Sequence, residues 1–378
     1  MKIANIVFWK VLLAILAISS SQFLEMKDKN SIPHKPNNEI DMILFPDIGH
    51  LGVIHLGDKK QAFNVILATG NDVTWVRDVK KFNSSEFNVL NCSQSSTCIT
   101  TTQYDSFVYS AGGAIYGNKT YEKLSLGDLV LQNFSLVLAD WDSGEIAGVD
   151  GVLGLGTSPK KNLHYPNLLD RLQSSGQIKS KSFSMYFGHQ HIFNGEVTGK
   201  FIFGDYNPKY ASGDFTFLNL TNTVSWTANL NAITLGSEEI TTKALPICFD
   251  SLTDSIYLPW KIQNEIVEKL NCEWRAYEAP TYECDCNSLS QAPNLTFNFN
   301  GTLFSVPPSA YSFSYMVKDS KHCYLSIEEF KQPYPEYQGV LGISFLKNFY
   351  SYWNIDNKTI GLAPPSNQGA INSEKILY

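Results

Sequence analysis

Short apolar runs make up most of the chain from Leu44 onward. They are rich in Val, Ile, Leu, Phe, Tyr and Thr, and they are separated by Gly, Asn, Asp and Pro. This pattern is typical of many short β-strands joined by turns. We predict a mainly β fold with helices at residues 165–173 and 261–270. The second helix follows Pro259, and its apolar face consists of Ile262, Ile266, Val267 and Leu270.

A weak internal duplication divides this β-rich region into two halves. In the first half, Ala68-Thr69-Gly70 precedes Gly151-Val-Leu-Gly154 by about 85 residues. In the second half, Asp250-Ser251-Leu252 precedes Gly339-Val-Leu-Gly342 by about 90 residues. A repeat of this kind indicates two structural units of similar plan.

The composition is that of an ordinary globular protein. The 378 residues include 43% apolar and 13% aromatic side chains, which is enough for one large core or two moderate ones. The net charge is -7, and the Lys and Arg residues are scattered along the chain. This distribution argues against a nucleic acid as a partner.

The N-terminus has the features of a secretory signal. Lys2 and Lys10 precede an apolar run over residues 11–18, and Ser19-Ser20-Ser21 follows it. The apolar run is too short to span a bilayer, so we predict a signal peptide at residues 1–21, with an uncleaved anchor as the alternative. No later segment approaches membrane-spanning length, and we expect no membrane association after signal removal.

Glycosylation sequons and cysteines agree with export. The Asn-x-Ser/Thr triplets begin at Asn83, Asn91, Asn118, Asn133, Asn219, Asn294, Asn300 and Asn357. Seven cysteines are then expected to form disulfides with one left over, and their spacing does not resemble a zinc site. We expect a secreted glycoprotein, extracellular or in the lumen of the secretory pathway, with a lysosome-like compartment as the alternative.

The segment Val65-Ile-Leu-Ala-Thr-Gly-Asn-Asp-Val-Thr-Trp-Val76 resembles the first active-site strand and loop of the pepsin-like aspartic proteases, peptidase family A1. The resemblance extends over residues 44–363. Its further motifs, in order along the chain, are Gly52–Gly57, Gln61–Ile66, Asp150–Gly156, Gly339–Ile343 and Leu362-Ala363. A single Gly-Val-Leu-Gly would be weak support, but the ordered set is specific.

The resemblance implies an all-β, bilobal pepsin-like fold, in which two mainly antiparallel β lobes with a few short helices enclose a cleft. We expect a short pro-segment or N-terminal extension at residues 22–43. The N-terminal lobe would then occupy residues 44–208, the C-terminal lobe 209–365, and a polar tail 366–378. Zymogens of this family usually carry a longer pro-segment, so its shortness weakly favours an inactive protein.

One residue departs from the family at the catalytic centre. Active relatives use two aspartates that share one proton, so that one carboxylate activates a water while the other polarises the scissile carbonyl. The resemblance implies that Asp250 is the retained aspartate and that Ala68 stands at the position of the missing one. Thr69 and Ser251 keep the hydroxyls of the family's inter-lobe lock, whereas Leu252 replaces a glycine expected in a tight turn.

Two further sets of residues bear on activity. Asp72, four residues beyond Ala68, is a candidate substitute carboxylate, although a loop-capping role is the simpler interpretation. The resemblance places Tyr109 at the tyrosine of the substrate-covering flap and Trp75 at the partner of its hydroxyl. Gly112 and Gly113 belong to the same flap, which is one residue longer than usual in the family.

The resemblance also implies the disulfide pairing. Cys92 and Cys98 match a small disulfide loop of the family, and Cys286 matches its C-lobe cysteine, whose partner would be Cys323. Cys272 and Cys284 would then pair locally. Cys248 is the odd cysteine, and its apolar neighbours indicate a buried, inert thiol.

These observations favour a secreted pepsin-like homologue that is inactive or severely impaired and keeps a cleft for a peptide or protein segment. The first alternative is an active aspartic endopeptidase that uses Asp250 with a substitute carboxylate such as Asp72. The second is a structural, glycosylated surface protein with a blocked cleft. We expect a monomer that needs no cofactor and no metal.

Overall fold

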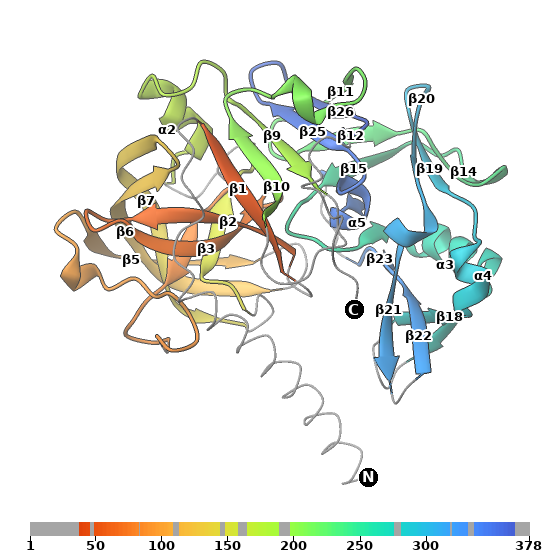
Figure 1. The fold of residues 1–378 in the computed structure, drawn as a ribbon, viewed down its shortest axis with the longest axis horizontal. Helices are drawn as coiled ribbons and strands as arrows, with labels where there is room; N and C mark the ends of the chain where they lie inside the picture. The colour runs from red at the N-terminus through yellow and green to blue at the C-terminus, as the bar shows by residue number, and fades with distance from the viewer. Residues whose placement is uncertain are drawn as a thin grey trace, which may run out of the picture. The chain divides into compact units, whose positions relative to one another are not determined.

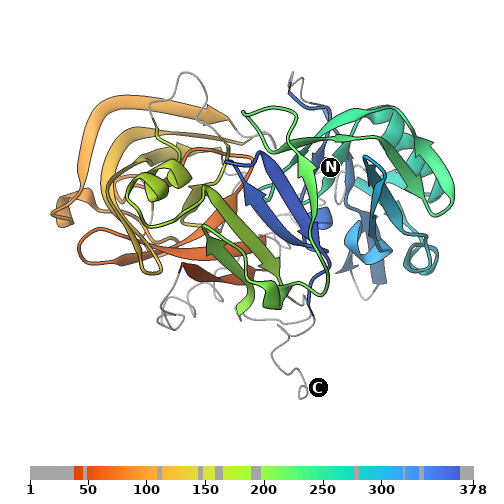
Figure 2. The same cartoon turned by 90° about the horizontal axis from the view of Figure 1, so that it is seen from above.

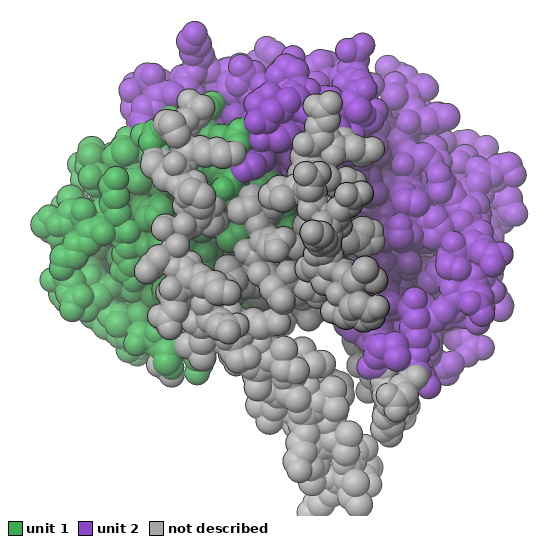
Figure 3. Space-filling model, in the orientation of Figure 1, with its two compact units in different colours: residues 1–67, 73–153, 190–199 green, residues 68–72, 154–189, 200–378 purple. Residues whose placement is uncertain are grey.

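The computed structural model describes residues 38–45, 49–82, 84–108, 113–143, 148–157, 165–188, 197–275, 281–317, 320–331 and 336–366. They fall into two compact units, coloured separately in Figure 3. Unit 1 takes residues 1–67, 73–153 and 190–199, and unit 2 takes residues 68–72, 154–189 and 200–378. The predicted signal peptide at residues 1–21 lies outside the described residues.

Unit 1 is built from one run of hydrogen-bonded strands in the order β1-β2-β3-β8-β4-β7-β6-β5. The long strand β6 also pairs with β2, through His55 and Ser125, so this run of strands folds back on itself. The strands are β1 Glu39–Phe45, β2 Gly49–Leu56, β3 Gln61–Ala68, β4 Trp75–Arg77, β5 Ile99–Val108, β6 Ala114–Leu126, β7 Leu129–Asp142 and β8 Gly151–Gly154, with a short 3-10 helix η1 Cys92–Gln94.

A buried carboxylate fixes the start of β8. Asp150 is fully buried, and its oxygens accept hydrogen bonds from the backbone N–H of Asn64 at 2.7 Å and from the backbone N–H of Asn88 at 2.7 Å. Burial raises the pKa of Asp150, and the hydrogen bonds from Asn88 and Asn64 act in the opposite direction. This side chain therefore ties the start of β8 to β3, the strand that ends at Ala68.

Unit 2 contains three small sheets, in the orders β12-β15-β24-β16-β23, β14-β13-β19-β20 and β17-β18-β22-β21, and the run β11-β26-β25-β9. Strand β10 Val197–Phe203 is divided between the units. The strands of unit 2 are β9 Ser182–Phe187, β11 Thr216–Asn219, β12 Thr227–Leu230, β13 Ala232–Leu235, β14 Glu238–Thr241, β15 Leu245–Phe249, β16 Ile256–Leu258, β17 Glu273–Arg275, β18 Thr281–Cys284, β19 Leu295–Phe299, β20 Thr302–Val306, β21 Ser312–Val317, β22 Ser320–Leu325, β23 Ile327–Glu329, β24 Val340–Leu341, β25 Tyr350–Asn354 and β26 Thr359–Ala363. Its helices are α2 Leu168–Ser174, α3 Trp260–Lys269, α4 Cys286–Ser290 and α5 Ile343–Leu346, with 3-10 helices η2 Pro208–Tyr210 and η3 Pro308–Ala310.

Aromatic side chains form the core of unit 2. The green β9 and β11 lie beside the blue β25 and β26 in Figures 1 and 2. Phe183 stacks on Phe201 with ring centroids 5.1 Å apart and on Trp353 at 5.6 Å, and Trp226 meets Trp353 edge-on at 5.2 Å. All four side chains are fully buried, so they give this unit a large apolar core.

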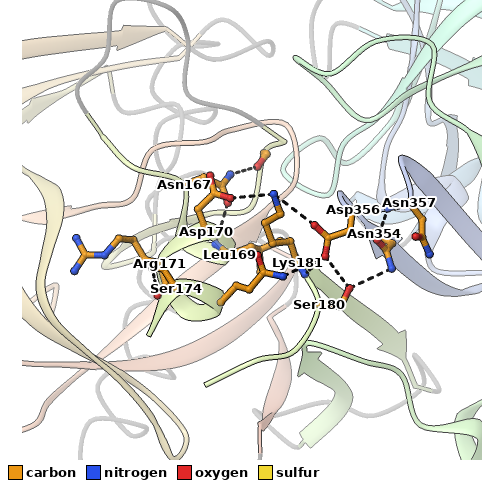
Figure 4. Close-up of polar contacts among 12 residues, drawn as sticks. Asn167, Leu169, Asp170, Arg171, Ser174, Ser180, Lys181, Asn354, Asp356 and Asn357 are labelled. Carbon is orange, nitrogen blue, oxygen red and sulfur yellow. Dashed lines mark hydrogen bonds and ion pairs between the residues drawn. The ribbon is translucent and has the colours of Figure 1, made fainter. Parts of the chain in front are cut away.

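Helix α2 begins at an asparagine that also holds a neighbouring loop. Asn167 accepts a hydrogen bond from the backbone N–H of Leu169 at 2.9 Å, which caps the helix, and its Nδ2 donates to the carbonyl of Gly156 at 2.6 Å. Figure 4 shows this cap beside Lys181, whose Nζ lies 3.3 Å from Asp170 and 3.4 Å from Asp356. Asn167 therefore anchors the residues that follow β8.

The mainly β fold that the sequence predicts is confirmed. Helix α3 lies within one residue of its predicted range, and Ile262, Ile266 and Val267 are buried as expected. Helix α2 begins three residues after the predicted start because Asn167 is its cap. The predicted boundary between residues 43 and 44 falls inside β1, where Met42 and Ile43 are buried. The other lobe boundaries remain predictions.

Candidate active site

Ala68 ends β3 and is fully buried. Its carbonyl accepts a hydrogen bond from the N–H of Leu155 at 2.9 Å, just beyond β8. The carbonyl of Leu155 in turn accepts one from the indole Nε1 of Trp226 at 2.9 Å. The backbone at Ala68 is therefore fixed through Leu155 to the aromatic core of unit 2.

Thr69 and Ser251 hold two loops together by reciprocal hydrogen bonds. The backbone N–H of Thr69 donates to Ser251 Oγ at 3.0 Å, and the backbone N–H of Ser251 donates to Thr69 Oγ1 at 2.9 Å. Thr69 Oγ1 also donates to the carbonyl of Phe249 at 3.1 Å. Both residues are buried, so these bonds satisfy polar groups that water does not reach. We call this pair the Thr69–Ser251 lock.

Asp250 follows β15, and its side chain is only 1% exposed. Its Oδ1 accepts hydrogen bonds from the backbone N–H of Gly70 at 3.1 Å and of Leu252 at 2.8 Å. Its Oδ2 accepts one from the hydroxyl of Thr253 at 2.9 Å. Sequence reasoning missed Thr253, although a hydroxyl three residues after the aspartate was the available signal. The buried carboxylate thus has three well-placed donors.

The two loops differ at the residue after the lock. An added Cβ at Gly70 would lie 2.2 Å from both Cγ and Oδ2 of Asp250, so only glycine fits there. Leu252 holds the matching place in the other loop and is half-buried. The backbone φ of Leu252 is not positive, so its conformation alone does not require glycine. The effect of this departure from the family pattern on activity remains a prediction.

Comparison with known protein families identifies a match over most of the chain. The family model described as eukaryotic aspartyl protease matches residues 49–365. The chain belongs to this family. Pepsin A of Gallus gallus is 26% identical over 338 residues, which cover 86% of each chain. Pregnancy-associated glycoprotein 4 of Ovis aries is 28% identical over 326 residues, or 84% of this chain and 82% of the relative. Vacuolar protease A of Arthroderma otae is 26% identical over 346 residues, or 89% and 83%.

In this aspartyl protease homologue, hydrogen bonds join Thr69 to Ser251 and Gly70 to Asp250, so the two loops lie side by side. The catalytic roles assigned to Asp250 and to the position of Ala68 remain predictions. The substitute role of Asp72 remains a prediction. Asp72 lies against Gly156, where an added Cβ would be 3.0 Å from the Cβ of Asp72. The N–H of Gly156 also donates to the carbonyl of Asn71 at 2.8 Å. These contacts place Asp72 beside the loop after β8.

The segment predicted to form the flap is described only in part. Strands β5 and β6 form an antiparallel hairpin in which Val108 pairs with Ala114, while Tyr109 and Gly112 lie outside the described residues. Gly113 is buried. Trp75 is fully buried, and its Nε1 has no hydrogen-bond partner within the described ranges. Its expected bond to the Tyr109 hydroxyl therefore remains a prediction.

Three disulfides join Cys92 to Cys98, Cys272 to Cys284 and Cys286 to Cys323, the pairs that the resemblance implies. Cys248 is a free, buried thiol. Burial raises its pKa, and the negative charge of Asp250 acts in the same direction. A thiol held in its protonated form is a poor nucleophile.

The sequons of this homologue differ in exposure. Asn91 and Asn118 are half-buried, and Asn83 lies outside the described residues. The exposed asparagines are Asn133, Asn219, Asn294, Asn300 and Asn357. Among the residues that the structure describes, no group of three or more His, Cys, Asp and Glu side chains is arranged to hold a metal ion. No helix in the described ranges has the length and apolarity needed to cross a membrane.

Proposed function

We propose that this member of the aspartyl protease family binds a peptide or protein segment and has lost efficient peptide cleavage. The observation that carries the proposal is the methyl side chain of Ala68, buried at the end of β3 beside the Thr69–Ser251 lock. A methyl group neither accepts a proton nor polarises a carbonyl. Asp250 would therefore act without the second carboxylate that the reaction needs.

The lock supports the assignment of Ala68 to the position of the missing aspartate. Thr69 and Ser251 exchange equivalent bonds, from the backbone N–H of each residue to the hydroxyl of the other. By this equivalence, the residues that precede them, Ala68 and Asp250, hold matching places in the two loops. One place carries a carboxylate with three donors, and the other carries no polar side-chain atom.

Retention of the surrounding architecture supports peptide binding rather than loss of all function. The lock is complete, and Asp250 keeps the donors that orient its carboxylate. The relatives named above include a pepsin and a vacuolar protease, whose names indicate enzymes that act on peptides. We propose that the same binding capacity serves here without turnover.

We also propose that the chain is secreted or retained in the secretory lumen. Three disulfides and five sequons with exposed asparagines support an oxidising compartment that glycosylates proteins. Expression of the full chain in a eukaryotic host tests this proposal. We expect disulfide-bonded protein in the medium or in secretory organelles, and recovery of reduced protein from the cytosol would contradict it.

Activity is tested by comparing the parent protein with Asp250→Ala from the same host and purification. Both are incubated at acid pH with denatured haemoglobin and a peptide library, with and without pepstatin. We expect both to give the same background, because the parent lacks a working pair of carboxylates. The proposal would be overturned if the parent cleaved the substrates and if both Asp250→Ala and pepstatin abolished that cleavage. The variant Asp72→Asn would then test whether Asp72 is the substitute carboxylate.

Binding is tested separately with the same peptide library and immobilised parent protein, against heat-denatured protein as the control. Bound peptides are identified by mass spectrometry, and the most enriched one is titrated by calorimetry. We expect intact peptides that bind the folded protein only. Recovery of no peptide would contradict the binding half of the proposal and favour a structural, glycosylated surface protein.

A further inference from the structure

Three aromatic rings are exposed on one face of the β5–β6–β7 sheet, whose strands lie side by side in Figure 1. The exposed fractions are 53% for Tyr104, 38% for Tyr116 and 49% for Trp141. Tyr116 on β6 lies directly opposite Trp141 on β7, and their rings meet edge-on with centroids 5.0 Å apart. We call these three residues the aromatic face. Exposed aromatic rings on one face offer apolar surface against which another group can pack.

The ring of Tyr104 lies across strand β6. Tyr104 belongs to β5, yet its hydroxyl donates a hydrogen bond of 2.8 Å to Asp140 on β7, and β6 lies between these two strands. In the strand register Tyr104 is opposite Asn118. The hydrogen bond therefore holds the tyrosine ring beside the Asn118 side chain.

Asn118 begins the sequon Asn118-Lys119-Thr120 and lies opposite Tyr104 in the strand register. It follows Tyr116 by two residues on the same strand, so both side chains point to the same side of the sheet. Its Nδ2 donates one hydrogen bond to the carbonyl of Thr101 at 3.2 Å. An amide nitrogen carries two hydrogens, so one remains for substitution.

We propose that Asn118 carries an N-linked glycan whose first sugars pack on Tyr104, Tyr116 and Trp141. The C–H groups of a pyranose match the electron-rich faces of aromatic rings, and stacking removes apolar area from water. The inference rests on the proposed export and not on the loss of catalysis. The glycan is thus a structural cover for the sheet that carries the flap hairpin.

The transfer uses a lipid-pyrophosphate-linked oligosaccharide as donor. A bond forms between Asn118 Nδ2 and C1 of the first sugar while the bond from C1 to the pyrophosphate oxygen breaks. The lipid pyrophosphate leaves with the bonding electron pair, and Nδ2 loses one proton. We expect the N–H that stays on Nδ2 to keep the hydrogen bond to the carbonyl of Thr101.

The chain offers a control sequon that lacks this platform. Asn357 is exposed in the turn between β25 and β26, and the residue two positions before it is Ile355. Asn219 lies two residues after Phe217, which is 51% exposed. It therefore has one exposed aromatic neighbour of the kind that Asn118 has, and it is a poorer control than Asn357. Asn357→Gln therefore removes a sequon without touching an aromatic platform.

Occupancy is measured first, on full-length protein secreted from eukaryotic cells. Release of glycans by an amidase in heavy-oxygen water converts each occupied asparagine to a labelled aspartate, which peptide mass spectrometry locates. We expect label at Asn118. Secreted protein with other sequons occupied and Asn118 bare would overturn the inference while leaving the proposed function intact.

Packing is measured by thermal unfolding of the parent, Asn118→Gln, Tyr116→Ala and the double variant. We expect Asn118→Gln to lower Tm by roughly 2 °C, and Tyr116→Ala to cost less in the Asn118→Gln background than in the parent. Asn357→Gln should leave the effect of Tyr116→Ala unchanged. Additive losses at residues 118 and 116 would overturn the packing.

A second readout covers the case in which Asn118→Gln does not fold. The glycan is instead removed enzymatically from the folded parent, and hydroxyl-radical oxidation of Trp141 is compared before and after removal. We expect Trp141 to be oxidised faster once the glycan is gone, while the buried Trp353 stays unchanged. Equal oxidation of Trp141 in both samples would contradict contact between the glycan and the ring.

Discussion

The loops at residues 68–70 and 250–252 are built on one plan and differ in what they carry. Each follows the end of a buried strand, and each gives one hydroxyl residue to the Thr69–Ser251 lock. In the second loop, Asp250 precedes the lock and accepts three hydrogen bonds. In the first, Ala68 precedes it and contributes backbone alone. The bonds that join the loops are thus separable from the carboxylates that perform chemistry.

The same comparison explains the residues after the lock. Gly70 has no room for a side chain because the carboxyl group of Asp250 lies where its Cβ would be. By the correspondence of the two loops, Leu252 should stand toward residue 68 as Gly70 stands toward Asp250, and Ala68 has no carboxyl group. We infer that a branched residue fits at position 252 because position 68 is small. We infer that the two departures from the family pattern form one coupled change.

The largest expected effect comes from restoring both positions at once. The double variant Ala68→Asp with Leu252→Gly should recover acid peptidase activity, with kcat/KM on the order of 10⁴ above the parent, because it regains the second carboxylate and the room for it. Ala68→Asp alone should stay inactive and lose stability, because its carboxyl group would meet the Leu252 side chain. A fluorogenic peptide assay at acid pH measures this.

The control for the double variant is the same protein with Asp250→Ala added, which should return to background. If Ala68→Asp alone were as active as the double variant, position 252 would not be coupled to position 68. If all variants were inactive and folded, the flap or another part of the site would limit catalysis.

Several features of the fold follow from the sequence by simple rules. Short apolar runs alternate with turn-forming residues, and this pattern predicts the β architecture. Pro259 and the helical spacing of the apolar residues after it locate α3 within one residue. Helices α4 and α5 have five and four residues, too few for a periodic pattern to show. Local pattern thus predicts long elements and misses short ones that tertiary contacts stabilise.

The candidate site is predicted less completely. The resemblance locates Ala68, Thr69, Asp250 and Ser251, but it does not single out Thr253, because threonine is common after a turn and only the folded loop points its hydroxyl at Asp250. The sequence also does not show why residue 70 is glycine. The group that leaves no room for a side chain there is the carboxyl group of Asp250, 180 residues away in the sequence. Contacts distant along the chain decide these roles.

Substitutions at Gly70 and Leu252 should differ in their effect on stability. Gly70→Ala should lower the free energy of unfolding by about 3 kcal/mol, because the new methyl group overlaps the Asp250 carboxyl group. Leu252→Ala should cost about 1 kcal/mol, since that side chain is half-buried and is only shortened. Urea unfolding measures both, and equal losses would remove the proposed asymmetry between the loops.

The control for Gly70→Ala is the same substitution in an Asp250→Ala background. With the carboxyl group gone, the added methyl group has space, and most of the loss should disappear. A loss that persists would show that backbone conformation, rather than the carboxyl group, requires glycine at position 70.

Breaking the lock should have a smaller effect than Gly70→Ala. Ser251→Ala leaves the buried N–H of Thr69 without its acceptor, which should cost about 2 kcal/mol. Thr296→Ala removes a similar hydroxyl contact, 2.7 Å from Ser305, on an exposed strand pair and should cost less than about 1 kcal/mol. The same urea titration compares them, and a loss at Ser251 as small as at Thr296 would mean that the lock adds little stability.

The smallest expected effect separates the charge of Asp250 from its shape. Asp250→Asn keeps one oxygen to accept from the N–H groups of Gly70 and Leu252, and the Thr253 hydroxyl can turn to accept from the new amide. We expect a loss of about 1 kcal/mol in urea unfolding, because hydrogen bonds to a charged group are replaced by neutral ones. Asp254→Asn, at the exposed neighbour, is the matched control and should be close to neutral. A loss at Asp250 well above that of Ser251→Ala would mean that the retained carboxylate, and not the lock, holds the two loops together.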